Sequence, residues 1–104
     1  MLQVDERQSG CNFDVTIGDA VEVQLSENPT TGYRWQLYAS YTPLLSLEND
    51  AFESSSQLPG AAGLRRWRFQ ALKEGEVQIK LDRRRSWERK AVQTFTIKIA
   101  VKRR

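Results

Sequence analysis

Hydrophobic and polar residues alternate with a period of two along most of this chain. That period places successive side chains on opposite faces of a β-strand, so that one face is buried and the other meets water. No window carries a convincing stripe with the spacing of an amphipathic helix. The apolar phases predict seven strands, built on Phe13, Val15 and Ile17; on Val21, Val23 and Leu25; on Tyr33, Trp35, Leu37 and Ala39; on Leu45 and Leu47; on Trp67, Phe69 and Ala71; on Val77, Ile79 and Leu81; and on Phe95, Ile97, Ile99 and Val101.

Short turn sequences separate these runs. Glycine, proline, asparagine and aspartate supply the backbone conformations that turns need. They occur here as Gly18-Asp19, Asn28-Pro29, Asn49-Asp50, Pro59-Gly60 and Glu74-Gly75. Seven or eight short strands in about a hundred residues predict an all-β fold, an immunoglobulin-like antiparallel β-sandwich. The 104 residues suit a single domain, residues 1–104.

The composition excludes most catalytic chemistry. The chain has no histidine and one cysteine, Cys11, so that neither a Ser–His–Asp nor a Cys–His arrangement can form within it. We therefore predict that it is not an enzyme, and we expect no small-molecule substrate, cofactor or metal. Cys11 is interpreted as a buried or incidental thiol.

Charge is distributed unevenly. Residues 1–63 hold two basic and nine acidic side chains, whereas residues 64–104 hold fourteen basic and four acidic ones. Such asymmetry is typical of proteins that bind nucleic acid or an acidic partner. No apolar run approaches the roughly 18 to 20 residues of a membrane span, and the first residues lack the apolar segment of a signal peptide. No membrane association is predicted.

Three connections differ from simple hairpin turns. The first, residues 28–33, combines an asparagine, a proline and a glycine around two threonines and predicts a stiff loop. The second, residues 58–64, carries such small side chains that its backbone is open to close approach by a partner. The third, residues 83–89, places Trp87 among charged residues, and tryptophan and arginine dominate binding hot spots. Each segment alone is also compatible with an ordinary turn, a flexible connector or a solvated face.

Together, and in this order, the three segments resemble the chagasin family, inhibitors of papain-like cysteine peptidases. In that family an NPTTG-aromatic loop is followed by a GxGG loop and then by an RPW or RPF loop. The first motif is intact here, whereas Ala62 replaces a glycine and Ser86 replaces a proline. The resemblance runs from about Phe13 to Val101. Its protease-binding residues map onto Asn28, Pro29, Thr30, Thr31, Gly32, Tyr33, Gly60, Ala61, Ala62, Gly63, Arg85, Ser86 and Trp87.

The resemblance implies a reversible, non-covalent inhibitor whose three loops gather at one end of the sandwich and fill the cleft of a papain-like cysteine protease. Thr30 and Thr31 would lie near the catalytic cysteine and histidine. The segment from Gly60 to Gly63 would follow the substrate groove, and Trp87 would pack against protease aromatics. By the same resemblance we expect a protein that is monomeric when free, at a periplasmic or secreted location.

Two other classes of protein remain open at this point. A basic β-sandwich that binds nucleic acid would use arginines such as Arg66 and Arg84 for phosphate contacts and Trp67 and Trp87 for stacking. An adhesive immunoglobulin-like domain would share the fold without inhibiting a protease, since fold alone does not determine function.

Overall fold

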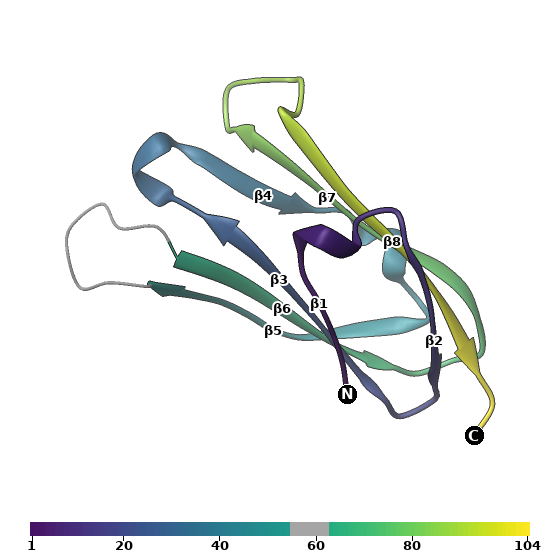
Figure 1. Cartoon of the computed structure of the whole chain (residues 1–104). Helices are drawn as coiled ribbons and strands as arrows, with labels where there is room; N and C mark the ends of the chain where they lie inside the picture. Colours follow the sequence, from purple (N-terminus) through teal and green to yellow (C-terminus); the bar gives the residue numbers. More distant parts are fainter. Residues whose placement is uncertain (55–62) are drawn as a thin grey trace.

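The computed structural model describes residues 1–54 and 63–104. These residues form two four-stranded sheets packed face to face, together with three single-turn 3₁₀ helices (Figure 1). The elements in chain order are β1 (Leu2–Val4), η1 (Glu6–Gln8), β2 (Asn12–Thr16), β3 (Ala20–Glu27), η2 (Pro29–Thr31), β4 (Tyr33–Leu37), η3 (Ala39–Tyr41), β5 (Leu45–Ser54), β6 (Gly63–Ala71), β7 (Gly75–Arg85) and β8 (Gln93–Lys102). The predicted all-β sandwich is confirmed. No helix in the described parts of the chain is long and apolar enough to cross a membrane.

One sheet has the strand order β1-β3-β6-β5 and the other has the order β2-β8-β7-β4. The pairs β3–β6, β5–β6, β4–β7 and β7–β8 are antiparallel, as predicted. Strands β1 and β2 differ, because β1 runs parallel to β3 and β2 runs parallel to β8. The chain crosses between the layers from β1 to β2 and again from β2 to β3, so it returns to the first sheet in its original direction. No short hairpin can make such a pair, so the alternation pattern carries no sign of it.

The core lies between the two sheets and consists of the predicted apolar phases. Trp67, Phe69 and Phe95 are the largest fully buried side chains, and Trp35 is also buried. Around them pack the aliphatic residues of β3, β6, β7 and β8: Val21, Val23, Leu25, Ala71, Val77, Ile79, Leu81, Ile97, Ile99 and Val101. The hydrophobic effect therefore fixes which face of each central strand points inward.

Four local predictions from the sequence are wrong. Asn49-Asp50 does not form a turn but lies inside β5, where an irregularity between Leu47 and Asn49 absorbs an extra residue as a β-bulge does. Strand β4 ends at Leu37, and Ala39 begins η3 instead of extending the strand. The segment 83–85 belongs to β7, which leaves residues 86–92 as the β7–β8 connection. Cys11 is exposed, so the buried alternative for this thiol is wrong and the incidental one stands.

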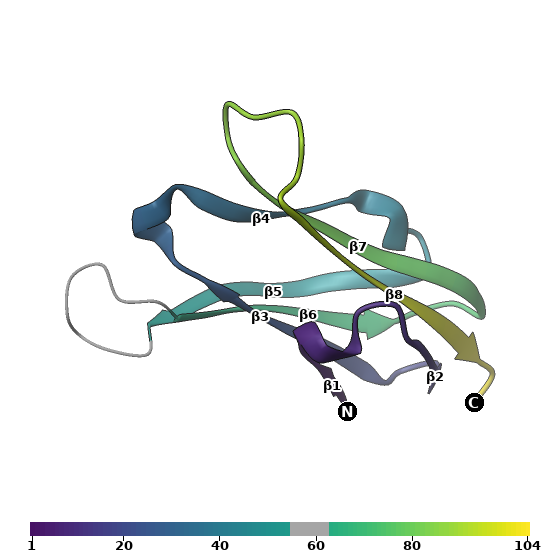
Figure 2. The same ribbon diagram turned by 45° about the horizontal axis from the view of Figure 1, so that its top comes forward.

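The connections that the sequence singled out leave the sandwich at the same end. The β3–β4 connection (residues 28–32) and the β7–β8 connection lie at the end opposite the two chain termini in both views (Figures 1 and 2). The strand ends Ser54 and Gly63, which flank the β5–β6 connection, pair with each other at that end as well.

Candidate functional site

Strand register brings the ends of the three connections together. Glu27, the last residue of β3, pairs with Gly63, the first residue of β6. Tyr33, the first residue of β4, pairs with Arg85, the last residue of β7. The β3–β4 connection therefore joins the two sheets between the entrances to the other two connections.

The β3–β4 connection is held by its own hydrogen bonds. The Asn28 side-chain oxygen accepts from the backbone N–H of Thr30 at 3.1 Å and also from the Thr30 hydroxyl. The Asn28 carbonyl accepts from the Thr31 N–H at 3.2 Å and from the Thr31 hydroxyl at 2.8 Å. The Thr31 hydroxyl oxygen in turn accepts from the Tyr33 N–H at 3.3 Å. Asn28 thus caps the short helix η2, with a proline at its first position, where a missing N–H costs nothing.

Gly32 ends this turn with a φ of +80°, a left-handed conformation that residues with a side chain adopt only at a cost. The position also faces the β7–β8 connection. A Cβ atom at Gly32 would lie 3.6 Å from the Trp87 ring and 3.9 Å from the Arg85 side chain. Glycine therefore lets the first connection turn back into β4 and lie close to Trp87.

Arg85 ties the two connections together. Its guanidinium carbon lies 4.4 Å from the centre of the Tyr33 ring and 5.7 Å from the centre of the Trp87 ring. Its Nε donates to the Thr31 carbonyl at a long 3.4 Å, and its Nη1 lies 3.7 Å from the Glu88 carboxylate. One arginine at the end of β7 thus spans the gap between both connections by stacking and by polar contacts.

The β7–β8 connection begins with a tight turn. The Glu88 N–H donates to the Arg85 carbonyl at 3.0 Å, which closes a four-residue turn with Ser86 and Trp87 in the middle. No described residue other than glycine has a positive φ, so the turn is of type I. Trp87 is 72% exposed and Val92, at the far end of the connection, is 57% exposed. A large aromatic side chain is thereby presented to solvent on a defined turn.

A buried ion pair lies beneath the β3–β4 connection. Glu27 is only 3% exposed; its carboxylate accepts from the Trp35 backbone N–H at 3.0 Å and lies 3.3 Å from Arg65 Nη1. The Trp35 indole N–H donates to the Ser26 carbonyl at 2.9 Å. Arg65 also contacts Asp50 at 2.6 Å, and this hydrogen bond is the main cause that raises the pKa of its guanidinium. These bonds join the end of β3 in one sheet to the start of β4 in the other, and so they fix both ends of the connection.

The predicted site residues fall into three groups. The structure places Asn28 to Tyr33 next to Arg85, Ser86 and Trp87, and Gly63 beside Glu27. Gly60, Ala61 and Ala62 lie outside the described residues. The sequence reasoning missed Glu27. Glu27 continues the inward phase of Val21, Val23 and Leu25, so a carboxylate in an apolar phase was the available signal.

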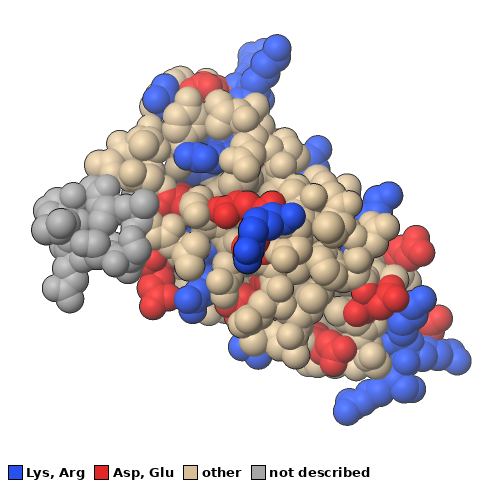
Figure 3. Space-filling model, in the orientation of Figure 1, with Lys and Arg blue, Asp and Glu red and all other residues tan. Residues whose placement is uncertain are grey.

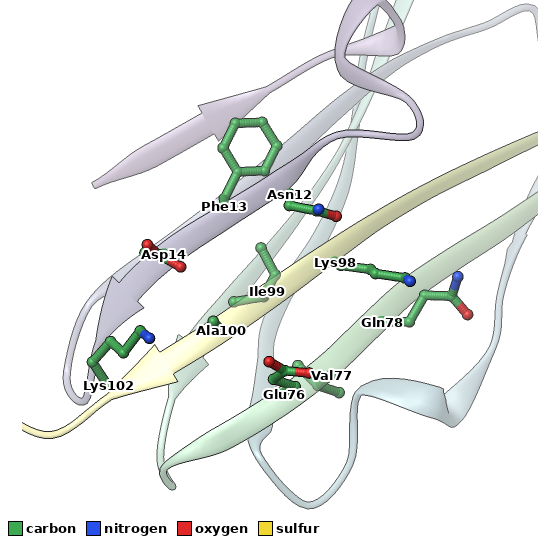
Figure 4. Close-up of a pocket in the computed structure, with 10 residues that line it drawn as sticks. All are labelled: Asn12, Phe13, Asp14, Glu76, Val77, Gln78, Lys98, Ile99, Ala100 and Lys102. Atoms are coloured by element: carbon green, nitrogen blue, oxygen red, sulfur yellow. The ribbon is translucent and has the colours of Figure 1, made fainter.

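A shallow hollow lies elsewhere, on the outer face of the β2-β8-β7-β4 sheet (Figure 4). Ala100 lies at its centre, paired with Asp14 on one side and Glu76 on the other. Its rim carries both charges, including Lys98 and Lys102. No group of three metal-ligating side chains occurs among the described residues, in this hollow or outside it.

Comparison with known proteins identifies the family. The model of the chagasin family peptidase inhibitor I42 matches residues 14–99. This chain belongs to the chagasin family. The chain is 29% identical to chagasin of Trypanosoma cruzi over 90 residues, which are 82% of each protein. It is 30% identical to amoebiasin-2 of Entamoeba histolytica over 87 residues, which are 81% of this chain and 70% of that protein.

Solved structures agree with this assignment. The crystal structure of the cysteine protease inhibitor EhICP2 from Entamoeba histolytica superposes with a TM-score of 0.87, at 25% identity, covering 97% of this chain and 95% of the other. PbICP-C, solved in complex with falcipain-2, shares the fold with a TM-score of 0.59 at 15% identity over the whole of both chains. Members of the chagasin family are peptidase inhibitors and not enzymes. The sequence-based resemblance is therefore confirmed, and this protein is a cysteine protease inhibitor.

Proposed function

We propose that this protein inhibits papain-like cysteine proteases by inserting the end of the sandwich that carries the three connections into the active-site cleft. One observation carries the proposal. The β3–β4 connection, which is fixed by its own hydrogen bonds, lies next to the exposed Trp87, and Arg85 contacts both. The inhibition is reversible and non-covalent, because occupying the cleft requires no covalent bond between this chain and the enzyme.

Pre-organisation supports tight binding. The hydrogen bonds from Thr30 and Thr31 to Asn28 exist in the free protein, so less conformational entropy is lost on association. Interfaces between proteases and protein inhibitors bury roughly 1,600 Å² in total and include some of the tightest complexes known. The exposed Trp87 is the type of residue that contributes most to such interfaces.

The shape of the β3–β4 connection also explains why an inhibitor of this kind would escape cleavage. Pro29–Thr31 forms a 3₁₀ turn, whereas a protease cleft takes a substrate as an extended strand. Presenting the Thr30–Thr31 bond as a substrate would require the bonds to Asn28 to break. The two exposed threonines therefore occupy the cleft without aligning a peptide bond with the catalytic groups of the protease.

The test is a titration of papain, and in parallel of a cathepsin L-type enzyme, with the folded protein. We expect loss of activity at one inhibitor per active site and full recovery on dilution. Trypsin and thermolysin, a serine protease and a metalloprotease, serve as controls and should keep their activity. Full papain activity at a large excess of folded protein would contradict the proposal.

A long incubation with active papain tests the mechanism separately. Mass spectrometry should recover the inhibitor at its intact mass. A fragment pair cut between Thr30 and Thr31 would show that the connection is read as a substrate instead.

A further inference from the structure

Two arginines that form no ion pair with a described residue lie opposite each other on the strands that carry the site. Arg34 on β4 pairs directly with Arg84 on β7. Trp35, the next residue of β4, is buried, so Arg34 lies on the outer face of the sheet. Like charges placed directly opposite each other destabilise a strand pair. Neither arginine forms an ion pair with any described residue.

A carboxylate close to this pair is already engaged. Asp82 lies two residues before Arg84 and therefore on the same face of β7. It accepts from the Tyr38 hydroxyl and, at 3.0 Å, from the Thr94 hydroxyl. Asp82 therefore serves two hydroxyl groups and makes no ion pair with either arginine.

The positive charge continues around the β7–β8 connection. Residues 33–37 and 83–92 together hold six basic side chains and one acidic one, Glu88, so their net charge is 1 + 5 − 1 = +5. Figure 3 shows basic side chains projecting where Figure 1 places the β7–β8 connection. We call the six residues the arginine cluster: Arg34, Arg83, Arg84, Arg85, Arg89 and Lys90.

The arginines of the other sheet show that this arrangement is not general in the molecule. Arg65 contacts Glu27 and Asp50, Arg66 contacts Glu53 at 2.9 Å, and Arg68 lies 4.0 Å from Glu48. On β6, every arginine has a carboxylate of its own chain. In the arginine cluster, Arg85 alone has a carboxylate partner among residues 1–54 and 63–104.

The cluster is continuous with the proposed protease-binding surface. Arg85 pairs with Tyr33 and stacks near Trp87, and the Arg34–Arg84 pair lies one residue further along the same two strands, with its side chains on the outer face of the sheet. Because β4 is the edge strand of its sheet, a protease seated over Trp87 that also covers this edge would meet Arg34 and Arg84. Its carboxylates would supply partners that these arginines do not find among the described residues.

We propose that the arginine cluster is a specificity-determining extension of the inhibitory site, which binds an acidic patch of Asp and Glu side chains beside the cleft of the target protease. This inference rests on the proposed function. Guanidinium groups bind carboxylates through paired hydrogen bonds, and charges at the rim of an interface chiefly raise the association rate. The cluster thus selects proteases with an acidic rim over those with a basic one.

The experiment measures association and dissociation rates with two papain-like proteases, one acidic and one basic beside the cleft. The test variant is Arg34→Gln/Arg84→Gln. The control variant, Arg103→Gln/Arg104→Gln, removes the same two charges at the C-terminus, at the opposite end of the molecule (Figure 1). We expect the test variant to associate about three- to tenfold more slowly with the acidic-rimmed protease at low salt, with a weaker dependence on salt. The control should stay within about twofold of the original protein, and neither variant should slow association with the basic-rimmed protease.

Three outcomes would overturn the inference. Equal slowing by both variants would mean that only net charge matters. Unchanged association in the test variant, with inhibition intact, would show that the cluster lies outside the interface and would leave the proposed function standing. Loss of binding to a fluorescent single-stranded oligonucleotide at about 150 mM salt, without any change toward the protease, would assign the cluster to nucleic acid instead. Failure of the original protein to inhibit either protease would contradict the proposed function itself.

Discussion

The β3–β4 and β7–β8 connections present neighbouring parts of one surface but are stabilised in different ways. The first is fixed by five hydrogen bonds among Asn28, Thr30, Thr31 and Tyr33, and by the buried Glu27 and Trp35 below it. The second has a type I turn, a hydrogen bond at its base from the Val92 N–H to the Arg83 carbonyl at 2.8 Å, a contact through Arg85 and a Trp87 that is 72% exposed. The comparison teaches that rigidity and contact area come from different segments. The first connection provides a shape that a cleft can accept, and the second provides the aromatic surface.

The largest expected effect concerns the base of the β3–β4 connection. Trp35→Ala removes a buried indole and its hydrogen bond to the Ser26 carbonyl, so it should lower the free energy of unfolding by about 3–5 kcal/mol. Urea denaturation followed by circular dichroism measures this loss. If the variant unfolded at the same urea concentration as the original protein, the connection would not depend on the core beneath it.

Trp87→Ala tests the β7–β8 connection. An exposed side chain contributes little to folding, so the melting temperature should change by less than about 2 °C. Inhibition should weaken by about 2–4 kcal/mol, or roughly thirty- to a thousandfold, as expected for a hot-spot aromatic. Inhibition constants against papain and a thermal melt on the same samples provide both values. A large drop in melting temperature without loss of inhibition would reverse the roles assigned to the two tryptophans.

Asn28→Ala separates the rigidity of the first connection from its composition. The change removes the acceptor for the Thr30 N–H but leaves both threonines in place. Loss of such a cap costs about 0.5–2 kcal/mol, which corresponds to roughly two- to thirtyfold weaker inhibition. Asn28→Asp keeps an acceptor oxygen at the same position and is the matched control. Equal weakening in both variants would show that the amide contacts the protease directly rather than organising the turn.

Ser86→Pro makes the less constrained connection more like the rigid one, and its effect is the smallest. Ser86 occupies the second position of a type I turn, where the backbone angle of proline fits and the Ser86 N–H has no described partner. Inhibition should tighten by about 0.4–1 kcal/mol because the turn loses less freedom on binding. Stopped-flow kinetics would detect this as slower dissociation or faster association. Weaker inhibition by a normally folded proline variant would show that the turn must change its geometry in the complex.

The sequence predicted the parts of the fold that depend on local patterns. Alternation along β3, β6, β7 and β8 identified the buried face, because a two-residue period leaves no other choice of face. Turn chemistry likewise predicted the stiff loop that begins at Asn28. The parallel pairing of β1 with β3, and of β2 with β8, could not be predicted in this way, since both pairs join strands that are not neighbours in sequence.

The parts of the site that the sequence did not reveal depend on contacts between sheets. The inward phase of Glu27 can be read from the sequence, but its partners, Arg65 and the Trp35 N–H, come from other strands and cannot. The missing partners of Arg34 and Arg84 also become visible only when strand register sets the two opposite each other. Asn49-Asp50 has the composition of a turn, but pairing with β6 on a ten-residue strand outweighs that local preference.

Some connections join strands of different sheets and others join neighbouring strands of one sheet, and a cut in the backbone has different consequences in the two cases. Strands β7 and β8 are hydrogen-bonded neighbours over nine residue pairs, so a nick in the connection between them would leave the ladder joined. Strands β3 and β4 belong to different sheets and share no ladder, so a nick at residues 28–32 would remove a covalent tether between the layers. A cut there would leave β3 held by its ladders with β1 and β6, and β4 held by its ladder with β7, without a covalent link between the two sheets at this end. An inhibitor cut at this connection would therefore lose the fixed shape of the segment before it lost the sandwich.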